Sequence, residues 1–123
     1  MNNEFVPYEQ AVELKELGFD EKCYRGYDKN QMLFYSEQEN GHELNYSVGM
    51  NVSAPLKQQV FRWFRQKYEV YPTIMTETED DSLYFRFIAE GGPEWLSFSK
   101  IYYTYEEAEL ACLKKLIEIV KSK

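Results

Sequence analysis

Apolar residues recur at helical spacing in three stretches of the chain. One of them lies in the middle of the chain, at residues 54–71. Pro55 is placed for a first helical turn, and we expect a helix from there to about Tyr68. At about 100° per residue, the bulky side chains of this central helix share an arc of ~160°, which is wide enough to be a core face. These side chains are Leu56, Val60, Phe61, Trp63, Phe64 and Tyr68.

The other side of the central helix is polar and positively charged. Residues 55–68 hold four basic residues and no acidic one, although the whole chain has a net charge of −7. Two arginines three positions apart, with glutamine amides beside them, suit phosphates or a carboxylate-rich surface. The candidate binding residues on this face are Gln58, Gln59, Arg62, Arg65 and Gln66. The alternative is a solvated face whose arginines pair with acidic residues of the same chain.

A second helix is predicted at residues 7–17, with Pro7 in its first turn and Gly18 just past its end. Phe19 is then placed for the hydrophobic contact of a Schellman-type ending. A third helix begins after Thr104, where Glu107 completes a capping box. Its apolar side is broad enough to lie across a sheet and comprises Ala108, Cys112, Leu113, Leu116, Ile117, Ile119 and Val120.

Strand-forming residues occupy most of the remaining chain. Residues 22–27 and 31–36 predict a β-hairpin around the turn-forming residues 28–30, and residues 44–52 predict a third, irregular strand. After the central helix, residues 73–78, 82–89 and 95–103 predict a three-stranded antiparallel meander. Alternation puts two sets on opposite faces of its second strand, Leu83, Phe85 and Phe87 against Tyr84, Arg86 and Ile88.

These elements predict an α+β fold in the order helix, hairpin, helix, three-stranded meander, helix. We expect a single domain over residues 1–123, with four or five antiparallel strands in one sheet and the helices mainly on one face of it. An aromatic content of 17% predicts a core built largely from rings.

Several classes of function are disfavoured by composition. The only histidine, His42, lies in a polar segment, and the two cysteines, Cys23 and Cys112, do not form a zinc-ligand pattern with it. The acidic turn at residues 79–81 lacks the alternating oxygen ligands of an EF-hand. We therefore expect no catalytic site, no metal and no cofactor. No apolar stretch is long enough for a membrane span, and the cysteine usage favours a cytoplasmic protein.

Three segments of the sequence are distinctive and together span most of the chain: FVPYEQAVELKELGFDEKC, SAPLKQQVFRWFRQKY and TYEEAELACLKKLIEIV. They resemble a family of small uncharacterised proteins from bacteria and their phages. No activity or catalytic residue is assigned to such proteins, so the resemblance implies only a phage-related or mobile-element context.

We expect a non-enzymatic binding or accessory module that has a protein partner and binds it through the exposed side of the central helix or through the mixed strand face. The alternative is a nucleic-acid-directed protein, which would bind through Arg62 and Arg65 or mimic DNA with its acidic remainder. The net negative charge repels phosphate backbones at long range, so the protein partner is favoured.

Overall fold

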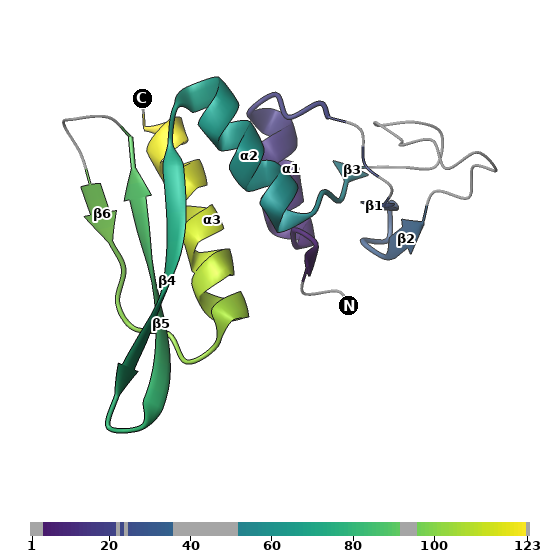
Figure 1. Ribbon diagram of the computed structural model, residues 1–123. Coiled ribbons are helices and arrows are strands. Elements are labelled where there is room, and N and C mark those ends of the chain that lie inside the picture. Colours follow the sequence, from purple (N-terminus) through teal and green to yellow (C-terminus); the bar gives the residue numbers. More distant parts are fainter. Residues whose placement is uncertain (1–3, 22, 24, 36–51, 92–95, 123) are drawn as a thin grey trace. The chain divides into compact units, whose positions relative to one another are not determined.

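The computed structural model describes residues 4–21, 23, 25–35, 52–91 and 96–122, with the backbone alone for residues 34, 35 and 96–98 (Figure 1). Helices and strands both contribute to this part of the chain, so the predicted α+β class is confirmed. The chain divides into two compact units, Met1–Leu56 (unit 1) and Lys57–Lys123 (unit 2). We predicted a single domain over residues 1–123, and the division into two units does not test this prediction.

Unit 1 contains helix α1 (Tyr8–Glu16), which lies within one residue of its predicted bounds at each end. The helix ends in a Schellman motif. Gly18 has φ 95°, a left-handed conformation that costs glycine least. The N–H of Phe19 donates to the carbonyl of Leu14 (2.9 Å) and that of Gly18 to Lys15 (3.0 Å). Phe19 and Leu14 are both buried, as the predicted hydrophobic contact at this helix end requires.

The strands of unit 1 are β1 (Arg25–Tyr27), β2 (Leu33–Tyr35) and β3 (Val52–Ser53), in the antiparallel order β2-β1-β3. The predicted hairpin is present, and its second strand begins two residues later than expected. Residues 22, 24 and 36 of the expected strands lie outside the described part of the chain. Asp28 organises its turn, because its carboxylate accepts from the N–H groups of Asn30 (2.8 Å) and Met32 (3.1 Å). Of the irregular strand expected at residues 44–52, residues 44–51 lie outside the described part of the chain.

Unit 2 begins with helix α2 (Lys57–Tyr68), continues through strands β4 (Tyr71–Glu79), β5 (Ser82–Glu90) and β6 (Leu96–Phe98), and ends with helix α3 (Tyr105–Lys121). The strands form an antiparallel sheet in the order β4-β5-β6, as the predicted meander requires. Asp80 and Asp81 make a two-residue turn between β4 and β5, with φ values of 51° and 65°. Positive φ at both positions is the geometry whose twist suits a tight hairpin.

One face of the β4–β5 hairpin carries α3 (Figure 1). The strand register puts Leu83, Phe85, Phe87 and Ala89 on this helix-facing side. Phe87 and Ala89 are buried, Phe85 is half-buried, and Leu83 near the turn is exposed. Burial therefore decreases toward the turn, and Figure 1 shows the hairpin extending past the first turn of α3.

The segment after β6 continues to pair with β5 through an irregularity. Ser99 lies opposite Phe87 and Tyr102 opposite Phe85, so this segment carries one extra residue, as in a β-bulge. The Ser99 hydroxyl accepts from the N–H of Phe87 (2.8 Å) in place of a backbone carbonyl. The bulge leads directly to Thr104, whose hydroxyl accepts from the N–H of Glu107 (3.1 Å) and caps α3 as predicted.

Two expectations need correction. The described strands form two three-stranded sheets where one sheet of four or five strands was expected, because alternation predicts a strand and its faces but not which edges will pair. Leu56 was assigned to the core arc of the central helix, yet it precedes α2 and is exposed. Its backbone bridges Phe5 instead, and the carbonyl of Pro55 accepts from Val6 (2.9 Å).

Candidate functional site

The central helix has the two-sided character that its sequence predicts. Its buried side chains include Val60, Phe61, Trp63 and Phe64, and the rings of Trp63 and Phe64 meet edge to face at 5.1 Å. Of the candidate binding residues, Gln59 is half-buried and four are exposed, namely Gln58, Arg62, Arg65 and Gln66. These five residues are called the α2 face below. Their role in binding stays a prediction.

One member of the α2 face is committed to an internal contact. The side-chain amide of Gln58 donates to Oε2 of Glu109 on α3, at 2.8 Å. The preceding residue, Lys57, places its ammonium 3.8 Å from Oε1 of the same carboxylate. Both oxygens of Glu109 therefore have a partner on α2.

The Lys57–Glu109 ion pair is buried. The side chains of the two residues are only 5% and 8% exposed, values that are rare for Lys and Glu unless the two are paired. Desolvation offsets much of the attraction in a buried pair, but removing one partner is costly because it leaves the other charge uncompensated. The pair therefore fixes how α2 packs on α3 and so determines the orientation of the α2 face.

The charge of the Glu109 carboxylate also affects the pKa values of two nearby groups. The pKa of Tyr105 is raised, first by burial and then by the negative charge of Glu109, while a hydrogen bond with Gln58 acts in the opposite direction. Burial, with a smaller contribution from Glu109, raises the pKa of the Cys112 thiol to about 12. Cys112 therefore stays protonated at neutral pH, when a nucleophilic cysteine would have to be a thiolate.

Sequence reasoning missed the Lys57–Glu109 pair, although a signal was present. Glu109 precedes Cys112 and Leu113 by three and four positions, which places it on the apolar side of its helix. Lys57 stands in the same relation to Val60 and Phe61. When the apolar faces of two helices each contain one charged residue and the two charges are opposite, the pattern is typical of a buried ion pair between the helices.

The remaining candidates for chemistry are the histidine and the acidic turn. His42 lies outside the described residues. Within the described ranges, no three His, Cys, Asp or Glu side chains are grouped to hold a metal ion. At the acidic turn, Asp80 and Asp81 are exposed, and the nearby Glu77 lies 3.9 Å from the guanidinium of Arg86.

No protein-family model, no curated protein and no solved structure matches this chain. The resemblance to small phage-related proteins therefore stays a prediction that rests on the three segments quoted above. Among the residues that the structure describes, no helix is both long and apolar enough to cross a membrane.

Proposed function

We propose that this chain is a non-enzymatic binding module, of phage or mobile-element origin, that docks an acidic protein partner through the outward part of the α2 face. The observation that carries the proposal is a pair of exposed arginines, Arg62 and Arg65, on a helix whose opposite side is buried. Arginine is suited to such a surface because its planar guanidinium binds carboxylates in a bidentate manner.

The rest of α2 makes this surface rigid. Trp63 and Phe64 anchor one side of the helix, and Lys57 and Gln58 hold its first turn to Glu109. A rigid surface loses little conformational entropy when a partner binds. Position-specific recognition by two arginines and Gln66 is therefore favoured over loose electrostatic attraction.

Two buried free cysteines, Cys23 and Cys112, support a cytoplasmic site of action, since thiols stay reduced there. We also expect the net charge of −7 to shape the choice of partner. A positive face on an acidic chain attracts an acidic partner only at short range, which favours docking over long-range steering.

The test compares two variants that change the net charge equally. Arg62→Glu with Arg65→Glu reverses the α2 face, whereas Lys29→Glu with Lys114→Glu reverses two exposed charges elsewhere. Immobilised wild type, test variant and control variant are used to capture proteins from lysate, and the captured proteins are quantified by mass spectrometry. We expect a partner that wild type and control retain and the test variant loses by tenfold or more (~1.4 kcal/mol).

Equal retention by the test variant would reject the α2 face as the docking surface. Circular dichroism of all three proteins checks that folding is unchanged. The alternative function, binding of nucleic acid through the same arginines, is decided by gel-shift titration over a salt series. Binding to nucleic acid in which the logarithm of the binding constant falls linearly with the logarithm of the salt concentration would favour it over the protein partner.

A further inference from the structure

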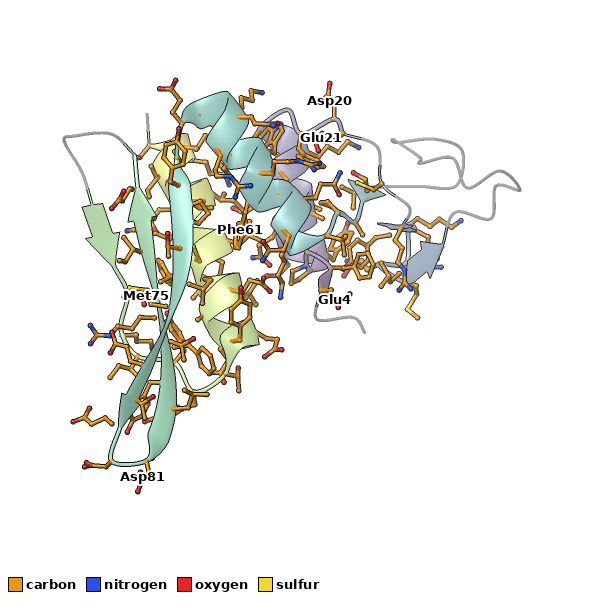
Figure 2. The ribbon with its side chains drawn as sticks, in the orientation of Figure 1. Glu4, Asp20, Glu21, Phe61, Met75 and Asp81 are labelled. Atoms are coloured by element: carbon orange, nitrogen blue, oxygen red, sulfur yellow. The ribbon has the colours of Figure 1, made fainter. Side chains whose placement is uncertain are left out.

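The projecting end of the β4–β5 hairpin exposes an unusual amount of apolar surface. Leu83 is 52% exposed and Tyr103 is 74% exposed, and Ile101 and Tyr105 are exposed beside them. All four belong to unit 2 and to the segments that meet near the hairpin turn. Figure 2 shows Asp81 at the far end of this hairpin, and Figure 1 shows that α3 stops short of it.

Side chains from both faces of the hairpin contribute to this exposed surface. On the helix-facing side, Phe85 meets the ring of Tyr105 at 6.0 Å with an interplanar angle of 88°. Leu83 lies two positions nearer the turn on this same side. On the opposite side, Tyr84 meets Tyr103 at 6.0 Å and 60°. The ring pairs are edge to face, so the exposed rings are held in place by their neighbours and remain available to a partner.

The same segments are uniformly acidic. Residues 71–85 and 101–113 contain seven acidic residues and no lysine or arginine. Asp80, Asp81 and Glu106 are exposed, and the buried one, Glu109, is already paired with Lys57. Two cations that flank these segments are already engaged, because Arg86 lies beside Glu77 and Lys100 lies over the ring of Tyr102 at 5.5 Å. Carboxylates therefore outnumber cations around the apolar contact, which favours a partner that supplies positive charge.

We propose that the hairpin end, formed by Leu83, Tyr84, Tyr103 and Tyr105 with Asp80 and Asp81 around them, is a docking surface for a basic segment of a partner protein. Apolar side chains of that segment pack on Leu83 and the tyrosine rings, and its lysines or arginines pair with the surrounding carboxylates. Cationic side chains also bind favourably over tyrosine faces, which selects a basic segment over an acidic one. This surface is distinct from the α2 face and does not depend on the function proposed for it.

The test uses fluorescence anisotropy of a labelled peptide in which Lys and Leu alternate, with a Glu-Leu peptide as its counterpart. Two variants of the full chain separate charge from apolar contact. Asp80→Asn with Asp81→Asn removes two charges, and asparagine tolerates the positive φ of both positions. Leu83→Ser with Tyr103→Ser removes the most exposed anchors. The control, Glu9→Gln with Glu16→Gln, removes two exposed charges from α1.

We expect the wild type and the control to bind the Lys-Leu peptide and not the Glu-Leu peptide. The asparagine variant should bind about fivefold more weakly at ~50 mM salt, and the difference should disappear near ~1 M salt. The serine variant should lose about tenfold at both salt concentrations, because apolar contact is not screened.

Three outcomes would overturn the proposal. One is absence of binding to the Lys-Leu peptide, and another is equal binding of both peptides. The third is self-association, measured by sedimentation equilibrium, that salt weakens and that Arg62→Glu with Arg65→Glu abolishes. That result would make the α2 face of a second copy the partner of this surface. If the Arg62→Glu with Arg65→Glu variant captures the same proteins as the wild type while the Lys-Leu peptide still binds, the function proposed above is rejected and the docking surface at the hairpin end stands.

Discussion

Replacing Glu109 with alanine is the sharpest test of the interior of unit 2. The substitution removes the carboxylate beside the Lys57 ammonium, which is 5% exposed, and takes from the amide of Gln58 the oxygen to which it donates. At 3.8 Å and an effective dielectric constant of ~20, the lost attraction is about 4 kcal/mol. Removing one partner of a buried pair costs ~3–5 kcal/mol in measured cases, and we expect Glu109→Ala to fall in that range.

The double variant Lys57→Met with Glu109→Leu should recover most of this loss, because two apolar side chains of similar size remove both desolvated charges at once. The control is Lys115→Ala, which breaks the Lys115–Glu118 pair. That pair is shorter, at 3.4 Å, but its side chains are 34% and 70% exposed, so we expect a change below ~0.5 kcal/mol. The change in the free energy of unfolding should therefore depend on how buried the pair is, and not on the distance between its charges.

Urea denaturation of the full chain measures each free energy of unfolding, followed by circular dichroism and by fluorescence of the buried Trp63. A loss below ~1 kcal/mol for Glu109→Ala would mean that water reaches Lys57 and that the pair is not buried in solution. A double variant as unstable as the single one would mean that shape, and not charge, explains the loss.

Three further predictions concern unit 2. Thr104→Ala removes the hydroxyl that accepts from Glu107 and should lower the free energy of unfolding by ~1 kcal/mol in the same assay, with no effect on the sheet. Asp80→Asn with Asp81→Gly supplies the residues that favour positive φ in two-residue turns and should raise it by ~0.5–1 kcal/mol, unless the turn relaxes in solution. The Cys112 pKa of about 12 lies above its unfolded value, so the stability it contributes is complete below about pH 9 and is lost as pH rises toward 12. Unfolding curves across that range should show the decline in wild type and a smaller one in Cys112→Ala, and equal declines would contradict the assignment.

The sequence predicted best what neighbouring residues decide among themselves. Gly18 with Phe19, and Thr104 with Glu107, are local patterns, and the structure has both helix ends where they were expected. The strand alternation of Leu83, Phe85 and Phe87 was also correct. Alternation does not specify, however, where a covering helix stops, and so it did not distinguish the buried Phe87 from the exposed Leu83.

Long-range pairing was the part that could not be predicted. Two sheets form because β3 pairs with β1 and not with the strands after α2, a choice that depends on edges separated in sequence. Gln58 and Glu109 are 51 positions apart, and recognising their contact requires the phases of two helices at once. The arginines of the α2 face were predicted from local spacing alone, and the structure has them exposed.

The position of α3 after the strands that it covers has a consequence for synthesis on the ribosome. Phe87 and Ala89 leave the ribosome well before α3, and the carboxylate that neutralises Lys57 is on α3 as well. Until that helix emerges, the nascent chain has an uncovered apolar strand pair and a lysine that lacks the Glu109 carboxylate, so unit 2 completes its folding late. Nascent intermediates of this kind are exposed to aggregation and bind chaperones. A chain interrupted before Tyr105 should therefore be found with chaperones or in aggregates.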